Sequence, residues 1–126
     1  MGNKIEVGEH VRIDKDNMNR IGIGKVTRVV NESIYVNMNN KYNLPVCFQI
    51  NNIVKHSKHL VDLIGEGDYV NGMQVLDVYK PRDLWEPVEI RVDSRYTNFI
   101  LTEDIKTIWT KEQYMANCYK VGGKDE

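Results

Sequence analysis

The chain has 126 residues, of which 41% are hydrophobic and 28% are charged, and its formal net charge is −1. This composition is that of a folded globular protein and excludes a disordered chain. Apolar runs of only a few residues exclude a transmembrane helix. Residues 1–7 lack the apolar segment of a secretory signal, so we expect no secretory signal.

The charges are unevenly distributed along the chain. Residues 1–64 carry nine Lys or Arg against six Asp or Glu, and residues 65–126 carry eight against twelve. The first half is therefore basic and the second half acidic. This asymmetry indicates either attraction between the halves or two different binding faces. The overall balance excludes the strong basic surplus of a general DNA-coating protein.

The first half is predicted to form a series of short strands. Apolar and polar residues alternate, which is typical of strands with one buried face, at 7–13, 23–30, 33–38, 44–49 and 54–56. Residues 14–22 are rich in Asp, Asn and Gly and are predicted to be a loop, and Pro45 favours an edge position for its strand. A helical turn is expected just before the last strand. This order is the layout of an SH3-like small barrel.

The second half repeats the pattern of the first. Segments 67–71, 73–79, 88–92, 96–101 and 105–108 match, in order, segments of the first half at 8–12, 24–30, 33–38, 44–49 and 50–53. Five matching elements in one order indicate a tandem duplication. We therefore predict a mainly β protein made of two tandem SH3-like barrels, at 1–64 and 65–126, each followed by a short helical turn. One continuous mixed β domain is the alternative.

Units of this size would each bury only roughly 60% of their unfolded surface, so we expect the halves to pack on each other. A helix is predicted after each of them. Ser57 is a candidate N-cap for residues 57–63, and Thr110 with Gln113 forms a capping-box pattern for a helix that ends near Asn117. A short strand is expected at 118–121.

The side chains that could carry chemistry do not form a convincing site. His56 and His59, together with Cys47 or Asp62, offer at most a sparse zinc-ligand set, and Ser57 lacks the strained turn of a catalytic nucleophile. Cys47 and Cys118 lie in different halves and are expected to remain reduced thiols. We therefore predict a protein that is not an enzyme and that uses no catalytic residue, metal or cofactor.

Two groups of residues are candidates for binding. The proline-bounded loop 79–87 places a tryptophan near its tip, and interface hot spots favour Trp, Tyr and Arg. The candidate partner-binding residues are Tyr79, Arg82, Trp85 and Trp109. The alternative for Trp85 is that it folds back on the core.

The second group is a basic strip in the first half. Basic side chains beside Tyr35 and Tyr42 are typical of small barrels that bind nucleic acid. The candidate residues are Arg12, Arg20, Lys25, Arg28 and Lys41. The alternative is that these side chains lie on solvated strand faces.

Residues 52–72, NIVKHSKHLVDLIGEGDYVNG, resemble a stretch of small uncharacterised proteins from phages and prophages of Firmicutes, IVKHSKNIIDLIEVGDYVNG. Residues 7–13 and 105–114 match the opening and closing segments of that family, so the resemblance spans nearly the whole chain. His59 stands where the family usually has Asn, and Gly65 departs from the family's Glu or Val.

The resemblance implies a phage or prophage origin and a location in the bacterial host cytoplasm, and it implies no catalytic activity. Small phage proteins of this kind include anti-CRISPR proteins. On this basis we expect a non-catalytic protein that binds and sterically inhibits a host protein, with a CRISPR-Cas effector as one candidate target. The alternatives are a nucleic-acid-binding module that uses the basic first half, and a structural part of the virion.

Overall fold

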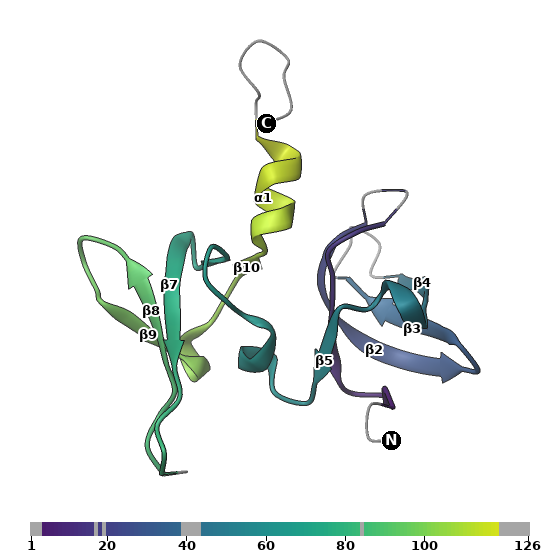
Figure 1. Ribbon diagram of the computed structural model, residues 1–126, viewed down its shortest axis with the longest axis horizontal. Coiled ribbons are helices and arrows are strands. Elements are labelled where there is room, and N and C mark those ends of the chain that lie inside the picture. The colour runs from purple at the N-terminus through teal and green to yellow at the C-terminus, as the bar shows by residue number, and fades with distance from the viewer. Residues whose placement is uncertain (1–3, 17, 19, 39–43, 84, 119–126) are drawn as a thin grey trace.

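The computed structural model of the chain describes residues 4–16, 18, 20–38, 44–83 and 85–118. The protein is mainly β, with two five-stranded antiparallel sheets. Figure 1 shows strands β2 to β4 and strands β7 to β9 at opposite ends of the long axis of the molecule, with the connecting segment between them. No helix among these residues is long and apolar enough to cross a membrane.

The first sheet has the strand order β4-β3-β2-β1-β5. Its strands are β1 (His10–Ile13), β2 (Gly22–Val30), β3 (Ser33–Asn37), β4 (Pro45–Gln49) and β5 (Lys55–Ser57). A single 3-10 turn, η1 (Ile50–Asn52), connects the last two strands. A second 3-10 turn, η2 (Leu60–Leu63), then leads to the second sheet.

The second sheet has the equivalent order β9-β8-β7-β6-β10. Its strands are β6 (Tyr69–Val70), β7 (Met73–Tyr79), β8 (Glu89–Asp93), β9 (Phe99–Leu101) and β10 (Ile108–Trp109). The 3-10 turn η3 (Thr102–Asp104) again precedes the last strand. Helix α1 (Lys111–Asn117) follows it.

The two sheets repeat each other in detail. In both, the second strand is bulged at an equivalent place, after Val26 in β2 and after Val75 in β7. In both, a glycine with positive φ, Gly8 or Gly67, donates its N–H to the carbonyl of that valine at 3.0 Å. Any other residue would be strained at this φ. Shared irregularities of this kind support the repeat that the sequence pattern predicted.

The two hydrophobic cores also correspond position by position. Alternate residues of each strand point to the core, which is why the period of two in the sequence predicts them. The matched buried pairs are Ile5 with Ile64, Val11 with Val70, Val26 with Val75, Ile34 with Ile90, Val36 with Val92 and Phe48 with Ile100. Ile64 therefore packs in the second core.

Several finer predictions need correction. Each sheet is open in the described residues, because its two edge strands do not pair with each other. The edge strands are β4 and β5 in the first sheet and β9 and β10 in the second. Closure into SH3-like barrels is therefore not confirmed. The segment 105–108 was matched to 50–53, but the second 3-10 turn is Thr102–Asp104. The repeat at this point is therefore three residues closer, and Ile105 is equivalent to Ile53.

The helices also differ in part from the prediction. The capping box of α1 is confirmed, because the Thr110 hydroxyl accepts the backbone N–H of Gln113 and the Gln113 side chain accepts that of Thr110. The short helical turn predicted after the first unit is confirmed as the 3-10 turn η2, but its N-cap is His59, so the prediction of Ser57 as the cap is wrong. Ser57 instead ends β5 and accepts the N–H of His59 at 3.0 Å. The predicted strand at 118–121 falls almost wholly outside the described residues.

We predict that the two sheets unfold together, because each is too small to be stable alone. Ile34→Val and Ile90→Val occupy the same position in the two cores, and each should lower the free energy of unfolding by about 1 kcal/mol. Urea unfolding followed by circular dichroism should show one transition that both variants shift. Two transitions, each shifted by only one variant, would contradict joint unfolding.

Candidate functional site

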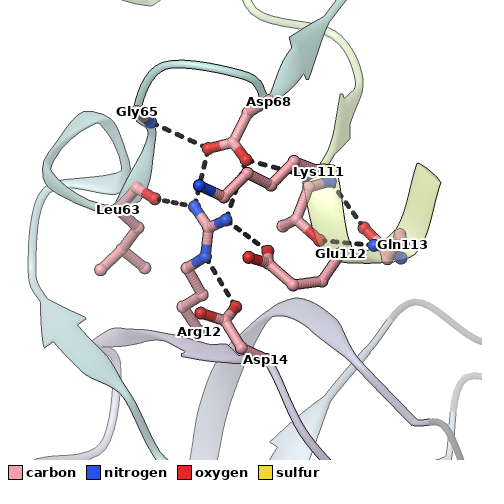
Figure 2. A network of polar contacts seen from close by, with 9 residues as sticks. Arg12, Asp14, Leu63, Gly65, Asp68, Lys111, Glu112 and Gln113 are labelled. Atoms are coloured by element: carbon pink, nitrogen blue, oxygen red, sulfur yellow. Dashed lines mark hydrogen bonds and ion pairs between the residues drawn. The ribbon is translucent and has the colours of Figure 1, made fainter. Parts of the chain in front are cut away.

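Arg12 on β1 joins the first sheet to the turn before β6 and to the start of α1. The residue is 7% exposed, and Figure 2 shows its guanidinium among acceptors from distant parts of the chain. It donates to Asp68 through two bonds of 2.7 and 2.8 Å and to the Leu63 carbonyl at 2.7 Å. It also donates to Glu112 at 2.7 Å and to Asp14 at 2.9 Å.

The Asp68 carboxylate forms the other half of this junction. It is 1% exposed, and besides Arg12 it accepts the backbone N–H of Gly65 at 2.8 Å and of Lys111 at 2.9 Å. A buried carboxylate is tolerated only when its lone pairs are satisfied in this way. The same side chain therefore fixes the turn before β6 and the first residue of α1 relative to the first sheet.

The electrostatics of the junction follow from burial and pairing. Burial alone would lower the pKa of Arg12, but the hydrogen bonds that it donates to Asp68, Asp14 and Glu112 raise this pKa well above its ordinary value. At this point a cation of the basic first half attracts two carboxylates of the acidic second half, those of Asp68 and Glu112. Arg12 was a candidate nucleic-acid contact, and the structure corrects this prediction because the guanidinium is buried and fully engaged.

The other members of the predicted basic strip are dispersed. Arg20 is bound to Asp16 at 2.9 Å, and this pairing lowers the pKa of Asp16 to about 2. Arg28 lies over the ring of Tyr35, with the guanidinium carbon 5.6 Å from the ring centroid. Lys25 is exposed. Lys41 and Tyr42 lie outside the described residues. Of the predicted strip, Lys25 and Arg28 are exposed on the surface. Neither forms an ion pair among those described.

A cleft of about 630 Å³ lies between the segment that connects the sheets and the loop after β7. Its apolar lining includes Leu60 and Val61 from the connecting segment and Val88 and Ile105 from the second half. Pockets of this volume that combine apolar walls with a few polar groups are the usual form of binding sites. This cleft is therefore the strongest candidate site among the described residues.

The polar side of the cleft is centred on Asp62. Its carboxylate accepts a bond from Lys80 at 2.6 Å and one from the Ser57 hydroxyl at 2.6 Å. These two donors lower the pKa of Asp62. Ser57 is thus held by a carboxylate as a donor, which is a structural arrangement, and no histidine bonds to its hydroxyl among the described contacts.

The predicted tryptophan loop forms part of the wall of this cleft. Pro81, Asp83 and Glu86 line it, and Trp85 next to them is 80% exposed, so its side chain does not fold back on the core. Arg82 is also exposed. Of the four predicted partner-binding residues, Arg82 and Trp85 are sequence neighbours of residues that line the cleft. The ring of Tyr79 instead lies against Arg91.

Trp109 belongs to a different cluster. It is the register partner of Tyr69 on the neighbouring strand, and it packs edge-on to Tyr114 of α1 with ring centroids 6.4 Å apart. Tyr69 and Tyr114 are stacked at 4.7 Å. Trp109 nevertheless remains 45% exposed. Tyr69 and Tyr114 could not be assigned to this cluster from the sequence, because only the fold brings α1 onto β6.

The outer face of the second sheet was also missed. Arg91 lies over the ring of Tyr79 at 4.7 Å, and Phe99 is its register partner on β9. Alternation along β8 could have revealed these positions, because Arg91 stands between the core residues Ile90 and Val92.

The described residues contain no group of three or more His, Cys, Asp or Glu side chains that could hold a metal ion. His56 instead contacts the buried carboxylate of Glu9, and Cys47 and Cys118 are free thiols. Comparison of the chain with protein-family models, with curated proteins and with solved structures finds no match.

We predict that Arg12→Met will lower the free energy of unfolding by about 3–5 kcal/mol, because it leaves the buried carboxylate of Asp68 without its cation. Chemical denaturation measures this loss. Arg20→Met is the matched control, since its ion pair with Asp16 is partly exposed and should be worth about 0–1 kcal/mol. Equal losses for the two variants would contradict a special role for Arg12.

Proposed function

We propose that the protein is a non-catalytic binding protein whose contact surface is carried by residues 65–126. One observation carries this proposal. Both sheets have the same core, yet every exposed aromatic side chain in the described part of the chain belongs to the second half. These residues are Tyr79, Trp85, Tyr96, Phe99, Trp109 and Tyr114.

Exposure of large aromatic side chains to water is unfavourable, and a unit with a purely structural role has no need of it. Isolated apolar residues are common on surfaces, but Trp and Tyr are the residues that dominate binding energy at interfaces. The second half combines them with the cleft beside Trp85. A protein partner that inserts a side chain into this cleft would bury Trp85 at the rim of the same contact.

The biological setting that we propose comes from the resemblance to small phage and prophage proteins. In that setting the partner is a host protein, and binding inhibits it by occupying its surface. A CRISPR-Cas effector is one candidate target. We also propose that each sheet is an SH3-like unit, because a 3-10 turn before a short last strand recurs in both.

A nucleic-acid-binding module is the second candidate, and one observation favours it. Lys25 and Arg28 are exposed on the first sheet, and Arg28 lies next to the ring of Tyr35, on which a base could stack. Two such cations are a small electrostatic footprint, because the electrostatic affinity for nucleic acid grows with the number of phosphates that Lys and Arg neutralise. This candidate is therefore the weaker one.

We expect the tagged protein to capture one stoichiometric protein from lysate of a CRISPR-bearing bacterial host, with and without nuclease, as identified by mass spectrometry. Trp85→Ala should then weaken the affinity for that purified protein about 30-fold, which corresponds to about 2 kcal/mol. Calorimetry measures the change.

Val54→Ala is the control, because Val54 is an exposed apolar residue of the first half, and it should leave the affinity unchanged. Loss of capture on nuclease treatment would replace this function with the nucleic-acid module. Unchanged affinity in alanine variants of Tyr79, Arg82, Trp85 and Trp109 would refute the assignment of the surface.

A further inference from the structure

The outer faces of the two sheets carry opposite charges at matched positions. Because the bulges keep the strands in phase, Arg28 of β2 and Asp77 of β7 occupy the same place, each one residue after the bulge and facing away from the core. One position is therefore a cation in the first sheet and an anion in the second.

The difference extends across both faces. The first face carries Lys25 and Arg28 on β2, and its register partners on β3 are uncharged. The second face carries Asp77, Glu89 and Asp93, with Arg91 as its single cation. The formal charges of these outward positions of the two sheets, excluding the edge next to the connecting segment, are thus +2 and −2. Lys25 lies near residues 105–108, so Arg28 is the more accessible of the two cations.

Both faces also offer apolar area around these charges. On the first face Val30 is 38% exposed, and Tyr35 and the exposed Cys47 pair with each other across β3 and β4. On the second face Tyr79 and Phe99 are 44% and 41% exposed. Interfaces combine an apolar centre with complementary charges, and both faces meet this description.

We propose that the occupant of each face is a second copy of this chain, with the outer face of β2–β4 of one molecule bound to the outer face of β7–β9 of the next. These strands lie at opposite ends of the long axis in Figure 1, so a molecule does not satisfy its own faces. A contact between two different faces repeats from copy to copy, and it produces an open chain or a closed ring.

In this contact, the arginine–tyrosine pairs of both faces would lie in the interface. The second face already binds one guanidinium of its own chain. The guanidinium carbon of Arg91 lies 4.7 Å from the ring centroid of Tyr79, and its Nη2 lies 3.7 Å from Oε1 of Glu89. In the proposed contact, Arg28 of the neighbouring molecule faces this surface. A second guanidinium beside Phe99 and Asp77 would repeat that chemistry. Cations over aromatic rings gain more when water is excluded, as it is between two faces.

A charge-reversal experiment tests the proposal. One variant, Lys25→Glu with Arg28→Glu, makes both faces negative, and a second variant, Asp77→Lys with Asp93→Lys, makes both positive. Sedimentation equilibrium should show that the wild-type protein associates more as its concentration rises. It should also show at least about tenfold weaker association in about 500 mM than in about 50 mM NaCl, because salt screens exposed charges.

Each variant alone should be monomeric, and an equimolar mixture of the two should associate again. Restored association also shows that both variants are folded, and circular dichroism checks each one separately. A wild-type protein that stays monomeric at low salt would overturn the proposal. So would association that survives charge reversal, or a mixture of two folded variants that remains monomeric.

Discussion

The buried ion pair between Arg12 and Asp68 ties the two sheets together. It connects β1 of the first sheet to the turn before β6, and through Asp68 and Glu112 it also holds the start of α1. The connecting segment itself has only short 3-10 structure, and Arg12 and Asp68 bind its Leu63 carbonyl and Gly65 N–H. The connecting segment lines part of the cleft, and it also lines a second pocket around Arg12. The shape of the cleft therefore depends on the junction between Arg12 and Asp68.

The repeat explains how such a junction can arise. Glu9 is the counterpart of Asp68, and both backbone carbonyls accept the N–H of the equivalent valine in the second strand. The carboxylates differ, because Glu9 contacts His56 within its own unit while Asp68 reaches across to Arg12. The counterpart of Arg12 is Asn71, whose side chain bonds to the backbone of residues 104–107 of its own unit. Two positions therefore keep their place in the fold and change their partners.

What could be predicted from the sequence is what depends on local pattern. The period of two identified the core positions, and the repeat predicted the second sheet from the first. The capping box identified the start of α1 at Thr110. The junction could not be predicted, because Leu63, Asp68 and Glu112 lie 51, 56 and 100 residues from Arg12 and share no motif with it. The match of residues 105–108 to the first 3-10 turn was wrong for a similar reason. Two isoleucines three residues apart are compatible with either a 3-10 turn or the start of a strand.

We conclude that the buried pair of Arg12 and Asp68 joins the two repeated units. A double-mutant cycle with Arg12→Met and Asp68→Asn, followed by chemical denaturation, tests it most directly. We expect a coupling energy of about 2 kcal/mol or more, because both partners are buried and share two hydrogen bonds of 2.7 and 2.8 Å. A coupling energy within about 0.5 kcal/mol of zero would show that the two sheets are held together by something else.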